Sequence, residues 1–64
     1  MPVIRIELAP GRSREQKKET AVAITDAVSR ICKCAPEAVH VVFIEVSNSH
    51  WAVGGRFLDE PKPS

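Results

Sequence analysis

An alternation of apolar and charged residues runs through positions 3–8 of the chain. Because neighbouring side chains of a strand point to opposite faces, one face would be apolar and the other would carry Arg5 and Glu7. The apolar face would consist of Ile4, Ile6 and Leu8. Pro10 and Gly11 then interrupt the pattern. The segment predicts a strand whose apolar face is buried.

The next pattern has the spacing of an amphipathic helix and runs from Arg14 to about Lys33. Ser13 is placed as the N-cap, and Gln16, three residues later, completes a capping box. The expected buried stripe consists of Ala21, Ile24, Ala27, Val28 and Ile31. The expected solvent face consists of Lys17, Lys18, Glu19 and Arg30. Pro36 disfavours helical geometry at the preceding residue, so the helix must end before it.

A second strand is predicted over residues 39–46, after a short turn at residues 36–38. Its side chains are nearly all β-branched or aromatic and are apolar on both faces, as in a strand that is covered on both sides. A polar turn at residues 47–50 and a short hairpin at residues 51–57 follow. Residues 58–64 contain two prolines and are expected to form a mobile tail.

The order strand, helix, strand predicts a parallel strand pair joined by a right-handed crossover helix. With the C-terminal hairpin, residues 1–64 form one small α+β domain. A single helix covers only one face of the sheet, and a chain this short buries only about 60% of its unfolded surface. The second apolar face must therefore meet another subunit, and we expect a homo-oligomer.

The composition narrows the class of protein further. Cys32 and Cys34 are separated by a single residue and could not join distant segments, and the first residues lack the pattern of a signal peptide. We therefore expect free thiols in a reducing, cytoplasmic compartment. The spacing of these cysteines from His40 and His50 matches no zinc site, so no metal is expected. The formal net charge of +1 would not attract nucleic acid, and no apolar run is long enough to span a membrane.

Pro2 is the first candidate for chemistry. A methionine followed by a small residue such as proline is a usual substrate for methionine removal, which would leave the secondary amine of Pro2 free. An α-amino group has an ordinary pKa of about 7.7–8.0, and burial or a neighbouring cation would lower that pKa. A neutral amine could act as a base or as a nucleophile. Because the predicted strand begins at Val3, the amine would be held at the end of a sheet.

Several segments of the chain match, in order and spacing, those of one enzyme family. They are Pro2, Gly11-Arg12-Ser13, Glu15-Gln16-Lys17, Ala35-Pro36, the strand at residues 39–46, and His50-Trp51-Ala52-Val53-Gly54-Gly55. On these residues the chain resembles 4-oxalocrotonate tautomerase, from residue 2 to about residue 57 without a gap. The resemblance implies a tautomerase-superfamily, MIF-like fold, a hexamer arranged as a trimer of dimers, and no cofactor.

The resemblance also implies a reaction. In that family the N-terminal proline moves a proton between the oxygen-bearing end and a carbon of a small unsaturated 2-hydroxy or 2-oxo acid. Pro2 would take the proton from the 2-hydroxyl of a substrate such as 2-hydroxymuconate and return it to a remote carbon. Neighbouring subunits would contribute to each site. A role in the catabolism of aromatic hydrocarbons would follow.

Two further residues coincide with family positions that shape the substrate site. Arg12 matches an arginine that holds the distal carboxylate of the substrate, and a guanidinium suits a bidentate grip on such a group. A cation beside a helix N-terminus is mildly unfavourable, because that end of the helix is itself positive. An arginine at this position therefore indicates another role. Trp51 stands where the family has a phenylalanine that forms an apolar wall, and it could equally anchor a subunit interface.

His40 departs from the family pattern, which has a second arginine at this position. That arginine binds the 2-oxo oxygen and the nearby carboxylate, and losing such a fixed cation can cost on the order of 3 kcal/mol in the transition state. A histidine side chain is mostly neutral at pH 7. His40 is a candidate substrate-binding residue or only a strand residue, and Arg5 or Arg56 could supply the missing charge.

Three functions are open at this point. The first is a cofactor-independent isomerase that acts on a small carboxylate. The second keeps the scaffold but hydrates, dehalogenates or decarboxylates an unsaturated acid, with Pro2 protonated and acting as an acid. The third is an oligomeric binding module that has lost activity because His40 replaces the second arginine.

Overall fold

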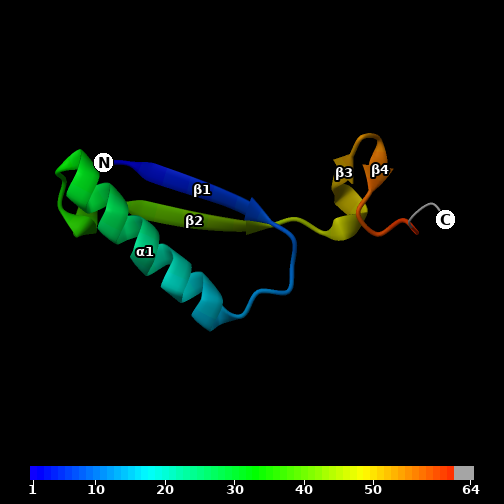
Figure 1. The fold of residues 1–64 in the computed structure, drawn as a ribbon, viewed down its shortest axis with the longest axis horizontal. Coiled ribbons are helices and arrows are strands. Elements are labelled where there is room, and N and C mark those ends of the chain that lie inside the picture. The colour runs from blue at the N-terminus through cyan, green and yellow to red at the C-terminus, as the bar shows by residue number, and fades with distance from the viewer. Residues whose placement is uncertain (62–64) are drawn as a thin grey trace.

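The computed structural model describes residues 1–61 and consists of a β-α-β unit from which a small hairpin extends (Figure 1). Strand β1, Val3–Leu8, pairs in parallel with strand β2, His40–Glu45. Helix α1, Arg14–Cys32, connects the two strands and lies over one face of the sheet. The predicted element order, the parallel pairing and the α+β class are confirmed.

The connections and the hairpin complete the chain. A 3-10 helix, η1, spans Pro36–Ala38 before β2, and a second one, η2, spans Asn48–His50 after it. Strands β3, Ala52–Val53, and β4, Arg56–Phe57, then form an antiparallel hairpin. The two turn residues between them, Gly54 and Gly55, have φ values of 60° and 83°. Tight hairpin turns of this kind need positive φ at both central residues, which glycine adopts without strain.

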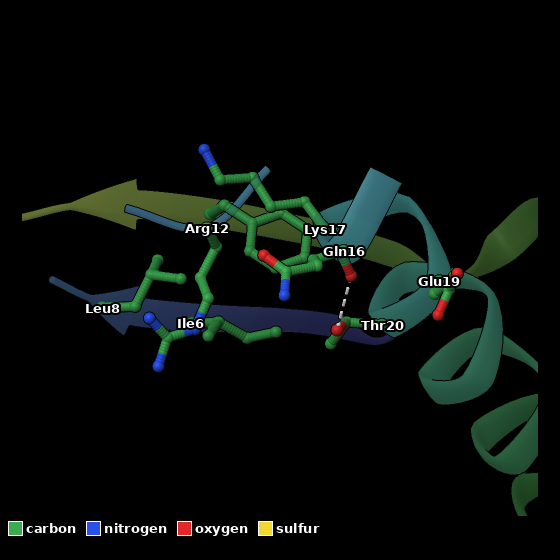
Figure 2. A pocket seen from close by; sticks show the side chains of 8 residues that line it. Ile6, Leu8, Arg12, Gln16, Lys17, Glu19 and Thr20 are labelled. Carbon is green, nitrogen blue, oxygen red and sulfur yellow. Dashed lines mark hydrogen bonds between the residues drawn. The ribbon is translucent and has the colours of Figure 1, made fainter. Parts of the chain in front are cut away.

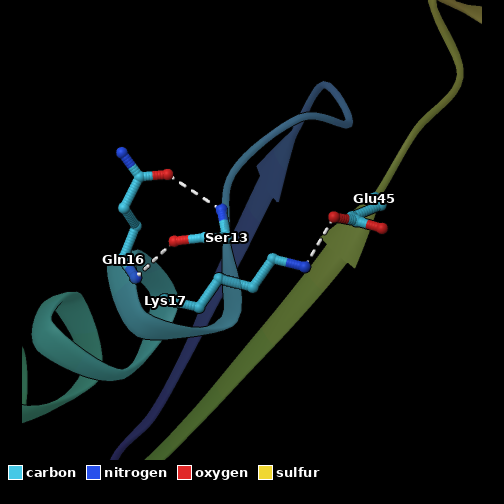
Figure 3. A network of polar contacts seen from close by, with 4 residues as sticks. All are labelled: Ser13, Gln16, Lys17 and Glu45. Carbon is cyan, nitrogen blue, oxygen red and sulfur yellow. Dashed lines mark hydrogen bonds and ion pairs between the residues drawn. The ribbon is translucent and has the colours of Figure 1, made fainter.

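The N-terminus of α1 is fixed by the predicted capping box, drawn in Figure 3. The backbone N–H of Gln16 donates to the Ser13 hydroxyl oxygen at 3.1 Å, and the Ser13 N–H donates to the Gln16 side-chain oxygen at 2.8 Å. At the other end, Lys33 adopts the left-handed conformation with φ 57° and caps the helix. The capping box thus gives partners to two backbone N–H groups at the N-terminus that would otherwise have none.

The two faces of the β1–β2 sheet differ in their cover. On the face toward α1, the strand register places Ile4 beside Val41 and Ile6 beside Phe43, and all four side chains are half-buried. The opposite face, called the open face below, carries two charged residues and a histidine among apolar ones. It consists of Val3, Arg5 and Glu7 on β1 and of His40, Val42 and Ile44 on β2.

The isolated chain does not close around a core. Among residues 1–61 no hydrophobic side chain is fully buried, and Val42, in the middle of β2, is still 43% exposed. The radius of gyration is 15.5 Å, against roughly 11 Å for a compact domain of this length. The excess comes from the hairpin, which projects beyond the end of the sheet (Figure 1). These features are those of a subunit that completes its core with other chains.

Two side chains of α1 differ in solvent exposure from the pattern predicted from the sequence. Ile31, expected in the buried stripe, is 68% exposed. The 19-residue helix is about 28 Å long and the six-residue strands about 20 Å, so its last turn extends past the sheet. Lys17, expected on the solvent face, is half-buried and forms an ion pair with Glu45 at the end of β2 (Figure 3). Its long aliphatic stem packs over the sheet while the ammonium reaches the carboxylate.

Other expectations from the sequence have simple outcomes. Cys32 and Cys34 are free thiols. In the part of the chain that the structure describes, no helix has the combination of length and apolar character needed to cross a membrane. Within the predicted tail, the N–H of Phe57 donates to the Glu60 carboxylate at 2.8 Å. Residues 62–64 lie outside the described residues, and the mobility of the tail stays a prediction.

Replacing Ser13 with alanine is expected to lower the free energy of unfolding by about 1 kcal/mol per chain, because it removes an acceptor from an otherwise unpaired helix N–H. Urea denaturation followed by circular dichroism at one fixed protein concentration measures the change. Ser13→Thr retains a hydroxyl and serves as the control. Equal loss in both variants would contradict a capping role.

Candidate active site

Pro2 lies directly before β1 and is held by the sheet. Its carbonyl oxygen accepts a hydrogen bond of 3.0 Å from the backbone N–H of His40, and the residue is half-buried. Met1, in contrast, is 82% exposed and has no strand or helix to hold it. The nitrogen that methionine removal would liberate is therefore attached to an ordered strand end.

His40 begins β2 at the same end of the sheet as Pro2. It pairs with Val3 in the strand register, so its exposed side chain lies on the open face. Of the two arginines considered as substitutes for a missing cation, Arg5 is on this same face, two residues along β1 from Val3. Arg56 is in the hairpin, where its guanidinium donates to the carbonyl oxygen of Pro61 at 2.6 Å. Only Arg5 shares the open face with His40 within one chain.

Arg12 lies at the opposite end of β1, between the strand and α1. Gly11, with φ 124°, turns the chain there in a conformation that other residues rarely adopt. The Arg12 side chain lines a hollow of about 330 Å³, and its guanidinium is turned toward β1 (Figure 2). Within residues 1–61 no carboxylate forms an ion pair with it. A partly apolar hollow with an unpaired guanidinium is suited to bind an organic anion.

The rest of this hollow comes from both strands and from the first turns of α1. Its lining comprises Ile6, Leu8, Gln16, Lys17, Glu19, Thr20 and Phe43 in addition to Arg12. Sequence reasoning did not assign Gln16, Thr20 or Phe43 to a site. The spacing of four residues between Arg12, Gln16 and Thr20 could have indicated Gln16 and Thr20. Residues four apart lie on the same side of a helix, and Arg12 lies just before its first turn.

Trp51 also lies at this end of the sheet, after β2 and η2. It is half-buried and lines a smaller hollow of about 260 Å³. The other lining residues are Glu7, Val46, His50 and Ala52. Glu7 is an open-face residue of β1, so this second hollow opens next to the open face, whereas the Arg12 hollow is on the face toward α1.

The four residues proposed from the sequence thus form two groups within one chain. Pro2 and His40 are at the N-terminal ends of the parallel strands, and Arg12 and Trp51 follow the C-terminal ends. The six residues of β1 between the groups span roughly 20 Å, which is longer than any side chain. A single copy of the chain therefore does not bring Pro2 and Arg12 together.

The described residues offer no cluster of metal ligands: in residues 1–61, no three side chains of His, Cys, Asp or Glu gather in a way that could hold an ion. The arrangement at the two strand ends consists instead of one potential amine, one imidazole, one guanidinium and an indole.

Comparison with known proteins gives a consistent result. A family model described as tautomerase enzyme matches residues 2–60. A probable tautomerase of Staphylococcus epidermidis is 44% identical over 55 residues, which cover 86% of this chain and 90% of the relative. The family match includes the whole β-α-β unit and the hairpin.

Solved structures agree with the sequence comparison. One neighbour, a 4-oxalocrotonate tautomerase homologue, has a TM-score of 0.90 and 32% identity, covering 98% of this chain and 100% of its own. A heterohexameric 4-oxalocrotonate tautomerase from Chloroflexus aurantiacus has a TM-score of 0.90 and 35% identity, covering 97% and 100%. On its sequence and on its fold, the chain belongs to the tautomerase family.

Proposed function

We propose that the chain is a cofactor-independent tautomerase of a small unsaturated 2-hydroxy or 2-oxo acid, with the amine of Pro2 as its acid–base group. The observation that carries the proposal is the position of Pro2, held by the 3.0 Å hydrogen bond to the His40 N–H behind a largely exposed Met1. Family membership supports the same class of reaction.

The proposed reaction requires one group that both takes and returns a proton. The neutral Pro2 amine would accept the proton of the substrate 2-hydroxyl, and the resulting ammonium would give a proton to a remote carbon of the conjugated chain. The electron pair of the O–H bond becomes part of the carbonyl, the double bonds shift, and the amine is regenerated. Arg12 would hold the distal carboxylate, and Trp51 would provide an apolar wall that excludes water from the site.

The roughly 20 Å between Pro2 and Arg12 implies that each complete site is shared between copies of the chain. The open face, with Val42 still 43% exposed, requires further cover and supports an assembly larger than two chains. A homohexamer, by analogy with the heterohexameric neighbour, would meet both requirements.

One alternative has an observation in its favour. The residue whose backbone N–H donates to the Pro2 carbonyl is His40, where the family pattern has an arginine. The site therefore has one fixed cation fewer than that pattern. A scaffold that has lost isomerase activity, or that uses a protonated Pro2 to hydrate, dehalogenate or decarboxylate an acid, would fit this difference.

The role of Pro2 is tested by intact mass and by ultraviolet assays on 2-hydroxymuconate and phenylenolpyruvate. The purified protein is expected to lack Met1, and Pro2→Ala to lower kcat/KM by about 100-fold or more, the usual range for loss of an acid–base group. Equal rates of wild type and Pro2→Ala on both substrates would refute the isomerase. Retention of Met1 would exclude catalysis by the Pro2 amine, because the Pro2 nitrogen would then be part of a peptide bond.

His40→Arg is expected to raise kcat/KM on the dicarboxylate 2-hydroxymuconate by up to about 100-fold, because it adds a fixed cation where negative charge develops. The gain on phenylenolpyruvate, which has a single carboxylate, should be smaller. His40→Gln, a neutral side chain, is the control. If His40→Arg brought no gain, another cation would already occupy that role.

The shared site is tested by mixing two inactive variants, Pro2→Ala and Arg12→Ala, after joint unfolding and refolding. Each site needs Pro2 from one chain and Arg12 from another, so random association should restore about a quarter of the wild-type activity. Each variant refolded alone is the control. A mixture as inactive as its components would show that both residues serve one site within the same chain.

A further inference from the structure

The segment that carries Arg12 is a loop with few contacts of its own. Residues 9–12 lie between β1 and the N-cap of α1, and within the described part of the chain they form no hydrogen bond or ion pair. A loop without internal contacts does not by itself fix the place of a side chain. The position of Arg12 therefore depends on the contacts at the two ends of the loop.

Both ends of this loop are attached to the same place, the end of β2. Before the loop, the carbonyl oxygen of Leu8 accepts a hydrogen bond of 2.9 Å from the Val46 N–H. After the loop, the Lys17 ammonium donates to the Glu45 carboxylate (Figure 3). Because Glu45 and Val46 are neighbours in the chain, the two contacts close the segment from Leu8 to Lys17 into a ring. Arg12 is near the middle of that ring.

The Lys17–Glu45 contact is unlike the other side-chain contacts of residues 1–61. It joins residues 28 positions apart, whereas the other side-chain hydrogen bonds there join residues at most five apart. The capping box fixes the first turn of α1 internally, but the ion pair ties that turn to the sheet. The Lys17 and Glu45 side chains are 27% and 43% exposed, so the pair has the modest strength of a contact near the surface. It is suited to hold a loop in place.

The ion pair also affects the charge of the Arg12 hollow. Lys17 lines this hollow together with Arg12. Their cationic groups nevertheless point to opposite sides of it, with the Arg12 guanidinium turned toward β1 (Figure 2). The Lys17 ammonium is satisfied by Glu45, whereas the guanidinium has no carboxylate partner within residues 1–61. Of these two cations, Arg12 is therefore the one available to an incoming carboxylate.

We propose that Lys17 and Glu45 are positioning residues for Arg12, because their ion pair closes the loop that holds the guanidinium in the hollow. Neither residue touches the reacting atoms. A guanidinium that is already held in place loses less freedom when a carboxylate binds, so the loop closure strengthens binding of the distal carboxylate. The inference deepens the proposed function and rests on it for the role of Arg12.

Removing either partner tests the loop closure in the full-length protein. Lys17→Met and Glu45→Gln should each raise KM for 2-hydroxymuconate about two- to fivefold, the range expected for one partly exposed ion pair, with kcat nearly unchanged. KM for phenylenolpyruvate should stay the same, because this substrate has no distal carboxylate for Arg12 to hold. The double variant K17M/E45Q should raise KM no more than either single change, since the same pair is lost in all three proteins.

Lys18→Met is the matched control, because it removes the same charge at the next, exposed position of α1. It should behave like wild type on both substrates. A lower KM in Glu45→Gln would overturn the proposal, since a released Lys17 would then bind the carboxylate itself. Additive increases in K17M/E45Q, or equal increases on both substrates, would also overturn it. If Lys17→Met does not fold, Glu45→Gln provides the same comparison with almost no change in side-chain shape.

A second measurement needs no activity, so the two proposals can fail separately. Hydrogen exchange of the Ser13 and Gln16 N–H groups, followed by NMR, should be about two- to fivefold faster in Lys17→Met and Glu45→Gln than in Lys18→Met, because the start of α1 opens more often. Such an increase, in a protein whose wild type isomerises neither substrate, would support the loop closure and refute the tautomerase. Unchanged exchange and unchanged KM in an active protein would refute the loop closure and leave the tautomerase intact.

Discussion

The parallel pairing of β1 with β2 is the interaction on which the rest of the structure depends. It requires a crossover, and α1 supplies one, but a single helix covers a single face. It also brings the N-terminal ends of both strands together, which is why the carbonyl of Pro2 meets the N–H of His40. Arg12 and Trp51 necessarily follow the opposite ends. The division of the candidate site and the exposed open face have the same cause.

Most of the fold could be predicted from the sequence because its signals are local. The alternation in β1, the Ser13–Gln16 capping box and the two adjacent glycines of the hairpin each act within a few residues. The errors are at Ile31 and Lys17, whose surroundings depend on the relative lengths of the helix and strands. Helical periodicity shows which side of a helix is apolar, but not where the sheet beneath it ends.

The sequence suggests which residues form the candidate site, but it does not show how far apart they lie. Pro2 was singled out as a potential N-terminal amine and Arg12 by the resemblance to 4-oxalocrotonate tautomerase, whereas their separation by the length of β1 follows from the strand that joins them. Phe43 had been assigned only to a strand covered on both sides, and the structure adds it to the Arg12 hollow. A site completed by a second chain has contacts that the periodicity of one chain does not encode.

Arg5 is the cation of the open face that could compensate for the histidine at position 40. It shares that face with His40, but its register partner on β2 is Val42, whereas His40 pairs with Val3. The Arg5 side chain therefore starts two residues, roughly 7 Å, further along the sheet than the side chain of His40. An arginine that must reach back over this distance loses more side-chain freedom than an arginine at position 40 would. On this reasoning, Arg5 is a poorer substitute than a direct replacement at position 40, which is why His40→Arg is expected to raise the rate even though Arg5 is present.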